Sequence, residues 1–189
     1  MVISFSGAPG SGKTTAAIAI ANYLQWPHYY VGGILRNLAK QKGITLAEIT
    51  KRAETDSSID REIDEYQKNL GQTSDNFIIE GRTSWYFIPR SLKIYLDVDL
   101  DEGVKRIWGE LAKQNNRNEG KSLTTIEVLK QNILNRIDSD KKRYNQYYHI
   151  DVFDKKNYDL YIDTTSLTPS QTFEYIKEFV NKKMAENAL

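Results

Sequence analysis

The sequence predicts an α/β protein in which a parallel five-stranded sheet is flanked by helices. Four short apolar runs have the composition of buried parallel strands, and a fifth is weaker; these runs are Val2–Ser6, Phe77–Glu80, Leu92–Asp97, Leu160–Asp163 and, as the weaker one, Tyr29–Val31. Helical patterns separate the runs. Such alternation of strands and helices is typical of a parallel sheet that is covered by helices on both faces.

The first strand leads directly into a glycine-rich loop, Gly7-Ala8-Pro9-Gly10-Ser11-Gly12-Lys13-Thr14, which matches the phosphate-binding pattern G-x-x-x-x-G-K-[ST]. Glycines let the backbone turn its N–H groups toward a phosphate, and the N-terminus of the Ala-rich helix from Thr15 to Leu24 favours the same anion. Lys13 is placed to reach the β- and γ-phosphates, and the Thr14 hydroxyl to ligate Mg²⁺. The pattern therefore predicts a nucleoside triphosphate site made by Gly7, Ala8, Pro9, Gly10, Ser11, Gly12, Lys13, Thr14 and Thr15.

Residues 32–70 follow the weak strand and are largely helical, with capping signals at Thr45–Glu48 and at Ser58. This segment is too long for one crossover between strands. We expect it to form a small helical insert over one side of the phosphate loop.

A polar stretch without periodicity, Lys113–Lys121, predicts either a lid or a solvated linker. An amphipathic helix is predicted from Ser122 to about Tyr148, and Pro169 opens a terminal helix. The helix from Ser122 carries one apolar face made of Ile126, Leu129, Ile133 and Ile137. The predicted organisation is one domain, 1–189, with a core of residues 1–31, 71–112 and 149–189, an insert at 32–70 and a lid region at 113–148.

Composition excludes several classes of protein. The formal net charge is +1, from 26 basic and 25 acidic residues, so we expect no nucleic-acid partner. The absence of cysteine excludes disulfides and cysteine-based metal sites. No basic region precedes a long apolar stretch, and Ala16–Ala21 is too short to span a bilayer. We therefore expect a cytoplasmic protein with no membrane partner.

The sequence lacks the N-K-x-D motif that a GTPase uses to bind guanine. A small phosphotransferase must instead hold an anionic acceptor, and this requires arginines outside the loop. Arg36 begins the insert, and Arg82 follows a strand at the sheet edge where ligands bind. Arg136, Asp140 and Arg143 share one helix face, although a solvated surface ion pair is the alternative for them.

Glu80 is the last residue of the apolar run Phe77–Glu80, where a carboxylate can hold Mg²⁺ directly or through water. The alternative is an acidic residue that caps a turn at the end of the strand. Gly81, the next residue, is expected to free backbone space beside the substrate.

Six stretches in this order make the chain resemble the nucleoside monophosphate kinases, and most closely the short archaeal-type cytidylate (CMP) kinases. They are G-A-P-G-S-G-K-T-T at Gly7–Thr15, G-G-I-L-R-N-L-A-K-Q-K-G at Gly32–Gly43, I-D-R-E-I-D at Ile59–Asp64, E-G-R at Glu80–Arg82, D-K-K-R-Y-N-Q-Y-Y-H-I-D at Asp140–Asp151 and Y-D-L-Y-I-D-T at Tyr158–Thr164. The phosphate loop is shared by a superfamily, whereas G-x-x-x-R, E-G-R and D-x-x-R-Y are much more specific.

The resemblance implies a P-loop fold of the nucleoside monophosphate kinase type, acting as a monomer on nucleotides. It implies Mg²⁺-dependent transfer of the γ-phosphoryl group of ATP to CMP or dCMP. By matched positions, Lys13 and Arg136 would face the transferring phosphates. The acceptor would be bound by Gly32, Arg36, Gly81, Arg82, Asp140 and Arg143, with the arginines on its phosphate and Asp140 on its cytosine or sugar.

Two departures from the family pattern bear on these expectations. Tyr30 and Val31 stand where the family usually has a serine or threonine, and Glu110 stands where it tends to have a lid arginine. Arg117 or Lys121 could replace that arginine, and Arg117 is our catalytic candidate. The alternatives are a kinase for AMP, UMP or a non-nucleotide alcohol, and an ATP-binding regulatory or assembly factor with weak transfer activity.

Overall fold

The computed structural model describes residues 1–111 and 125–186. Its five strands form one parallel sheet in the order β2-β3-β1-β4-β5, which confirms the predicted fold class. The strands are β1 (Val2–Gly7), β2 (His28–Tyr30), β3 (Phe77–Glu80), β4 (Leu92–Asp97) and β5 (Leu160–Asp163). Only the weak candidate is displaced: the strand begins at His28, and Val31 already belongs to the following helix.

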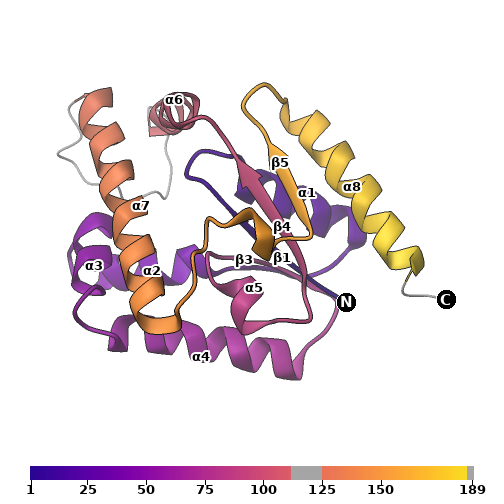
Figure 1. Ribbon diagram of the computed structural model, residues 1–189, viewed down its shortest axis with the longest axis horizontal. Coiled ribbons are helices and arrows are strands. Elements are labelled where there is room, and N and C mark those ends of the chain that lie inside the picture. Colours follow the sequence, from indigo (N-terminus) through magenta and orange to yellow (C-terminus); the bar gives the residue numbers. More distant parts are fainter. Residues whose placement is uncertain (112–124, 187–189) are drawn as a thin grey trace.

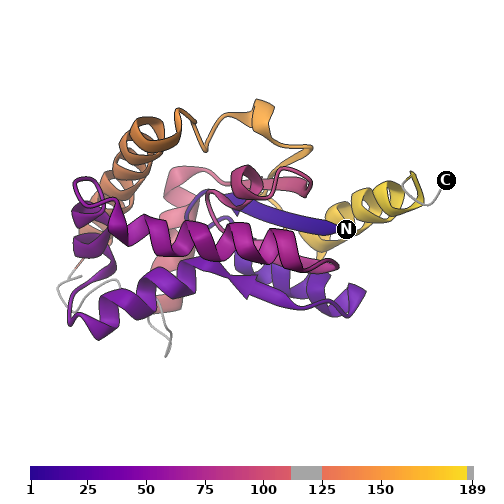
Figure 2. The same cartoon turned by 90° about the horizontal axis from the view of Figure 1, so that it is seen from below.

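Eight α-helices lie in the described part of the chain: α1 (Lys13–Leu24), α2 (Val31–Gln41), α3 (Leu46–Arg52), α4 (Ser58–Thr73), α5 (Ser84–Phe87), α6 (Leu100–Leu111), α7 (Ile126–Tyr148) and α8 (Pro169–Glu186). Helices α1 and α8 cover one face of the sheet, and α4 and α5 cover the other (Figures 1 and 2). The two cores follow the alternation of side chains along β1, because Ile3 and Phe5 pack toward α1 whereas Val2 packs toward α4. Among the described residues, no helix has both the length and the apolar character needed to cross a membrane.

The predicted insert is built from α2, α3 and α4. A capping box opens α3, since the Thr45 side chain accepts from the Glu48 N–H and Glu48 accepts from the Thr45 N–H. The prediction that Ser58 caps the next helix is wrong. Asp56 organises that start instead, because its Oδ1 accepts from both the N–H and the hydroxyl of Ser58.

Helix α7 determines the shape of the site. It begins after Thr125, whose hydroxyl accepts from the Val128 N–H, and it lies beside α3 and α6 (Figure 1). The predicted apolar face is confirmed, because Leu129 and Ile133 pack against Val104 and Ile107 of α6. Packing on that side turns the polar face that carries Arg136, Asp140 and Arg143 toward the sheet edge. The predicted loop at 113–121 and the predicted start at Ser122 lie outside the described residues.

Candidate active site

The phosphate loop turns tightly between β1 and α1. Gly10 and Gly12 have φ values of 81° and 80°, a left-handed conformation that glycine adopts without strain. A Cβ atom at Gly10 would lie 2.4 Å from the Gly103 carbonyl oxygen of α6. The loop therefore needs glycine at this position both for its dihedral angle and for its close contact with a neighbouring helix.

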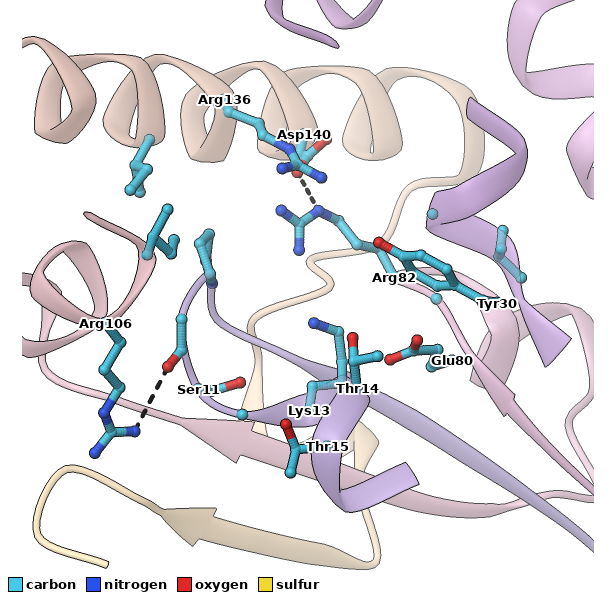
Figure 3. Close-up of a pocket in the computed structure, with 18 of the residues that line it drawn as sticks. Ser11, Lys13, Thr14, Thr15, Tyr30, Glu80, Arg82, Arg106, Arg136 and Asp140 are labelled. Atoms are coloured by element: carbon cyan, nitrogen blue, oxygen red, sulfur yellow. Dashed lines mark hydrogen bonds and ion pairs between the residues drawn. The ribbon is translucent and has the colours of Figure 1, made fainter. Parts of the chain in front are cut away.

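Two side chains that are not among the predicted site residues hold the phosphate loop from outside. The Thr164 hydroxyl donates to the Ser11 carbonyl oxygen at 3.0 Å. Arg106 donates to the Gly10 carbonyl oxygen at 3.5 Å and to the Thr164 carbonyl oxygen at 2.9 Å (Figure 3). Thr164 belongs to a stretch that carried the family resemblance, whereas Arg106 lies outside all six stretches and its partners are distant in the sequence.

A cavity of about 830 Å³ opens over the loop, and it brings together most of the predicted site residues. Its lining includes Pro9, Gly10, Ser11, Gly12, Lys13, Thr14, Thr15, Gly32, Arg36, Glu80, Gly81, Arg82, Arg136, Asp140 and Arg143. Gly7 and Ala8 are not part of the lining, and the Ala8 N–H donates to the Leu96 carbonyl oxygen at 3.0 Å instead. Arg117 lies outside the described residues. Glu110, which replaces the expected lid arginine, also lines the cavity.

Lys13 lies in a strongly perturbed environment at the phosphate end of this cavity. Desolvation lowers its pKa to about 8, and the charges of Arg82, Arg136 and Arg36 act in the same direction, while Glu80 opposes them. The concentration of cationic groups around one lysine is suited to a polyanion.

Glu80 is 1% exposed, and neither of its carboxylate oxygens accepts a hydrogen bond from a described residue. The turn-capping alternative is therefore wrong. The imidazole of His28 lies near it, with Nε2 3.6 Å from Glu80 Oε1. A buried carboxylate without hydrogen bonds is costly unless a cation is nearby, so Glu80 and Thr14 fit a metal ion. The described residues contain no group of three or more histidine, aspartate or glutamate side chains that could hold a metal without other ligands.

A chain of buried ion pairs crosses the cavity from the end of β3 to α4. Arg82 pairs with Asp140, the Asp140 carboxylate accepts from Arg143 Nη2 at 2.9 Å, and Arg143 Nε lies 3.1 Å from an oxygen of Asp60 (Figure 3 shows Arg82, Asp140 and Arg136). Asp140 and Arg143 are 2% and 1% exposed, so the solvated surface pair considered for this helix face is wrong. Arg143 Nη1 is buried and has no hydrogen bond from the described residues, which leaves a donor for a ligand.

Tyr30 occupies the position where the family pattern has a small hydroxyl residue. Its hydroxyl accepts from Arg36 Nη1, which also donates to the Gly32 carbonyl oxygen at 3.2 Å. A Cβ atom at Gly32 or Gly33 would lie 2.8 or 2.9 Å from the Tyr30 ring. The glycine pair therefore makes room for the tyrosine, and the tyrosine in turn positions Arg36 at the cavity.

A profile of the Cytidylate kinase-like family matches residues 2–166. The chain belongs to the cytidylate kinase-like family. It is 38% identical over 165 residues to a cytidylate kinase of Methanococcoides burtonii, covering 87% of this chain and 88% of the relative. It is 35% identical over 176 residues to a cytidylate kinase of Methanobrevibacter smithii, covering 93% of this chain and 96% of the relative. These findings confirm the resemblance that the sequence motifs indicated.

Solved structures support the fold of this family member. Shikimate kinase from Bacteroides thetaiotaomicron aligns with a TM-score of 0.62 and 15% identity, covering 96% of this chain and 98% of that one. Shikimate kinase from Aquifex aeolicus aligns with a TM-score of 0.56 and 16% identity, covering 97% of this chain and 98% of that one. At this identity the likeness concerns the fold alone.

Proposed function

We propose that this chain is a cytidylate kinase, which transfers the γ-phosphoryl group of ATP to CMP or dCMP and gives ADP with CDP or dCDP. One observation carries the proposal beyond family membership: a single cavity joins the phosphate loop to the buried chain of Arg82, Asp140 and Arg143. The loop suits a triphosphate donor, and the arginines suit an acceptor that carries its own phosphate.

The chemistry requires positioning and charge neutralisation more than covalent help from the protein. An oxygen of the acceptor phosphate forms the new bond to the γ-phosphorus, and the bond from that phosphorus to the β–γ bridging oxygen breaks. The acceptor oxygen is already ionised at neutral pH, so the step needs no general base. Lys13 and Arg136 neutralise charge on the transferring group, while Arg36, Arg82 and the free donor of Arg143 hold the acceptor phosphate. We assign Asp140, which is paired with two of these arginines, to the cytosine or the sugar of the acceptor.

We assign Thr14 and Glu80 as the residues that hold Mg²⁺. The fit rests on the buried carboxylate of Glu80, whose oxygens accept no hydrogen bond from the described residues, and on its place in the cavity that Thr14 also lines. When bound, the ion supplies positive charge against the donor phosphates and orients them. Because the described protein offers few ligands of its own, phosphate oxygens and water complete the coordination.

We propose further that residues 32–70 form the monophosphate-binding part and that 113–148 form the lid. Helices α2, α3 and α4 contribute Gly32, Arg36, Thr50 and Asp60 to the cavity, and α7 contributes Arg136. Closure of a lid would exclude water, which otherwise competes with the acceptor for the γ-phosphoryl group. We also propose that the chain acts as a monomer in the cytoplasm, as the resemblance to small nucleotide kinases implies.

The test is an ADP-release assay with ATP, Mg²⁺ and, separately, CMP, dCMP, UMP, AMP and GMP. We expect strong stimulation by CMP or dCMP. Stimulation only by another nucleotide would contradict the assignment of the acceptor, and stimulation by none would contradict a nucleoside monophosphate kinase.

Two variants test the assigned roles. Lys13→Ala should abolish transfer, because a charge aimed at the moving phosphoryl group is lost, whereas Lys182→Ala on the exposed side of α8 should transfer at the wild-type rate. Arg82→Ala should raise the KM for the acceptor while ATP binding survives. Transfer at the wild-type rate by Lys13→Ala, or an unchanged acceptor KM in Arg82→Ala, would remove that residue from the site.

A further inference from the structure

Two buried carboxylates line the far part of the cavity without a role in phosphate binding. Asp60 and Asp64 lie one turn apart on α4 and are 5% and 6% exposed. The charge of Asp60 is balanced by Arg143, as described above. Asp64 has no such cation: within residues 1–111 and 125–186, its hydrogen-bond partner is the Tyr148 hydroxyl, which donates to Oδ2.

A buried, ionised Asp64 without a cation paired to it is unfavourable for the folded chain. Burial is the largest effect on Asp64 and raises its pKa to about 6, and the hydrogen bond from Tyr148 only partly offsets this. Oδ1 accepts no hydrogen bond from the described residues. Asp64 lines the cavity, and a carboxylate with one oxygen that accepts no hydrogen bond from the protein is suited to accept one from a ligand.

The ion pairs order the cavity from one end to the other. The charges that act most strongly on Lys13 are Glu80, Arg82, Arg136 and Arg36, which define the phosphate end. From Arg82 the chain of ion pairs runs through Asp140 and Arg143 to Asp60. The charged groups that act most strongly on the pKa of Asp64 are Asp60, Lys68 and Arg143. Asp64 therefore lies one helical turn beyond the end of that chain. A nucleotide bound by its phosphate at Arg82 would extend its base toward Asp64.

The walls of this region are suited to a flat ring. Val31 and Leu35 of α2 and Ile63 of α4 line the same cavity as Asp64. Apolar side chains stabilise the faces of an aromatic base but do not distinguish one pyrimidine from another. A polar group at the edge of the ring must make that distinction.

We propose that Asp64 is a specificity-determining residue, whose Oδ1 accepts a hydrogen bond from the exocyclic amino group of the acceptor base and so favours cytosine over uracil. This proposal rests on the proposed function. An ionised carboxylate only accepts hydrogen bonds. Cytosine presents an amino donor at its 4-position, whereas uracil presents an oxygen acceptor there, which a carboxylate repels. Tyr148 acts as the positioning residue, because its hydroxyl holds Oδ2 and thereby orients Oδ1.

The experiment compares kcat/KM for CMP with kcat/KM for UMP in the wild type, in Asp64→Asn and in Glu62→Gln. Asparagine presents a donor as well as an acceptor, so we expect the CMP to UMP ratio to fall at least tenfold in Asp64→Asn. Glu62 is exposed on the same helix, and its variant removes the same charge and should keep the wild-type ratio. An unchanged ratio in a folded Asp64→Asn enzyme would overturn the proposal.

A modified substrate keeps the proposal testable even when the variant fails to fold. The monophosphate of 2-pyrimidinone riboside lacks the amino group of CMP, and we expect wild-type kcat/KM for it to be at least tenfold below that for CMP. Equal kcat/KM values for the two substrates in the wild type would overturn the role of Asp64. A wild type that phosphorylates no nucleoside monophosphate would contradict the proposed function itself. A wild type that phosphorylates CMP, with a CMP to UMP ratio that Asp64→Asn leaves unchanged, would contradict only the role of Asp64.

Discussion

The lowered pKa of Lys13 predicts that nucleotide binding takes up a proton. In the free protein this pKa is about 8, so the lysine loses its charge progressively as the pH rises above that value. Phosphate oxygens beside the ammonium favour its charged form, and we expect them to return the pKa at least to the ordinary 10.5. Nucleotide therefore binds the protonated protein better, and affinity falls as the pH rises.

The magnitude follows from these two pKa values. With only the protonated form competent to bind tightly, Kd rises in proportion to one plus the ratio of neutral to charged lysine. This gives roughly an eightfold weaker Kd at pH 9 than at pH 7.5, or about 1.2 kcal/mol. The terminal phosphate of the nucleotide titrates near pH 6, so it contributes little in this window.

Isothermal titration calorimetry of ATP binding measures both the Kd and the number of protons taken up. Repeating each titration in two buffers of different ionisation enthalpy should show uptake of about half a proton per nucleotide at pH 8 and nearly one at pH 9. Lys13→Met should bind more weakly and show neither the uptake nor the decline. A wild-type Kd that is flat from pH 7.5 to 9, without proton uptake, would refute the perturbation of Lys13.

Three further predictions concern the supports of the site. Arg143→Met should lower the free energy of unfolding by about 3–5 kcal/mol at pH 7 in urea titrations, because it leaves Asp60 buried without its cation and Asp140 with Arg82 alone; a loss under about 1 kcal/mol would contradict this. Arg106→Ala should raise the KM for ATP about tenfold and leave the KM for CMP within about twofold, because ~1.5 kcal/mol of hydrogen bonding to the phosphate loop is lost. Equal changes in the two KM values would contradict the role of Arg106 in supporting that loop. Glu80→Gln should raise the Mg²⁺ concentration for half-maximal rate, because a carboxylate ligand of the ion is lost; an unchanged Mg²⁺ requirement would exclude Glu80 as a ligand.

Much of the architecture could be predicted from local patterns. The runs around Ile3, Ile78 and Ile94 are buried strands because parallel strands covered on both faces need continuous apolar sequence. The capping box at Thr45 acts within four residues, and it formed as predicted. The prediction at Ser58 was wrong because Ser58 is already the first residue of the helix, and its hydroxyl donates to Asp56 rather than accepting from a later N–H.

The sequence by itself determined the phosphate loop, because the groups that bind the anion are consecutive and their conformation depends on glycines within the motif. Tertiary structure alone decided which charges neutralise one another. Asp60 and Arg143 meet only because α7 packs beside α3 and across the end of α4, and no periodicity encodes a pairing between residues so distant in the chain. Tertiary structure likewise decided the hydrogen bond from Arg106 to the phosphate loop and the hydrogen bond from Tyr148 to Asp64. These contacts depend on how whole helices cross, which is set by side-chain packing over the entire core rather than by any local stretch of sequence.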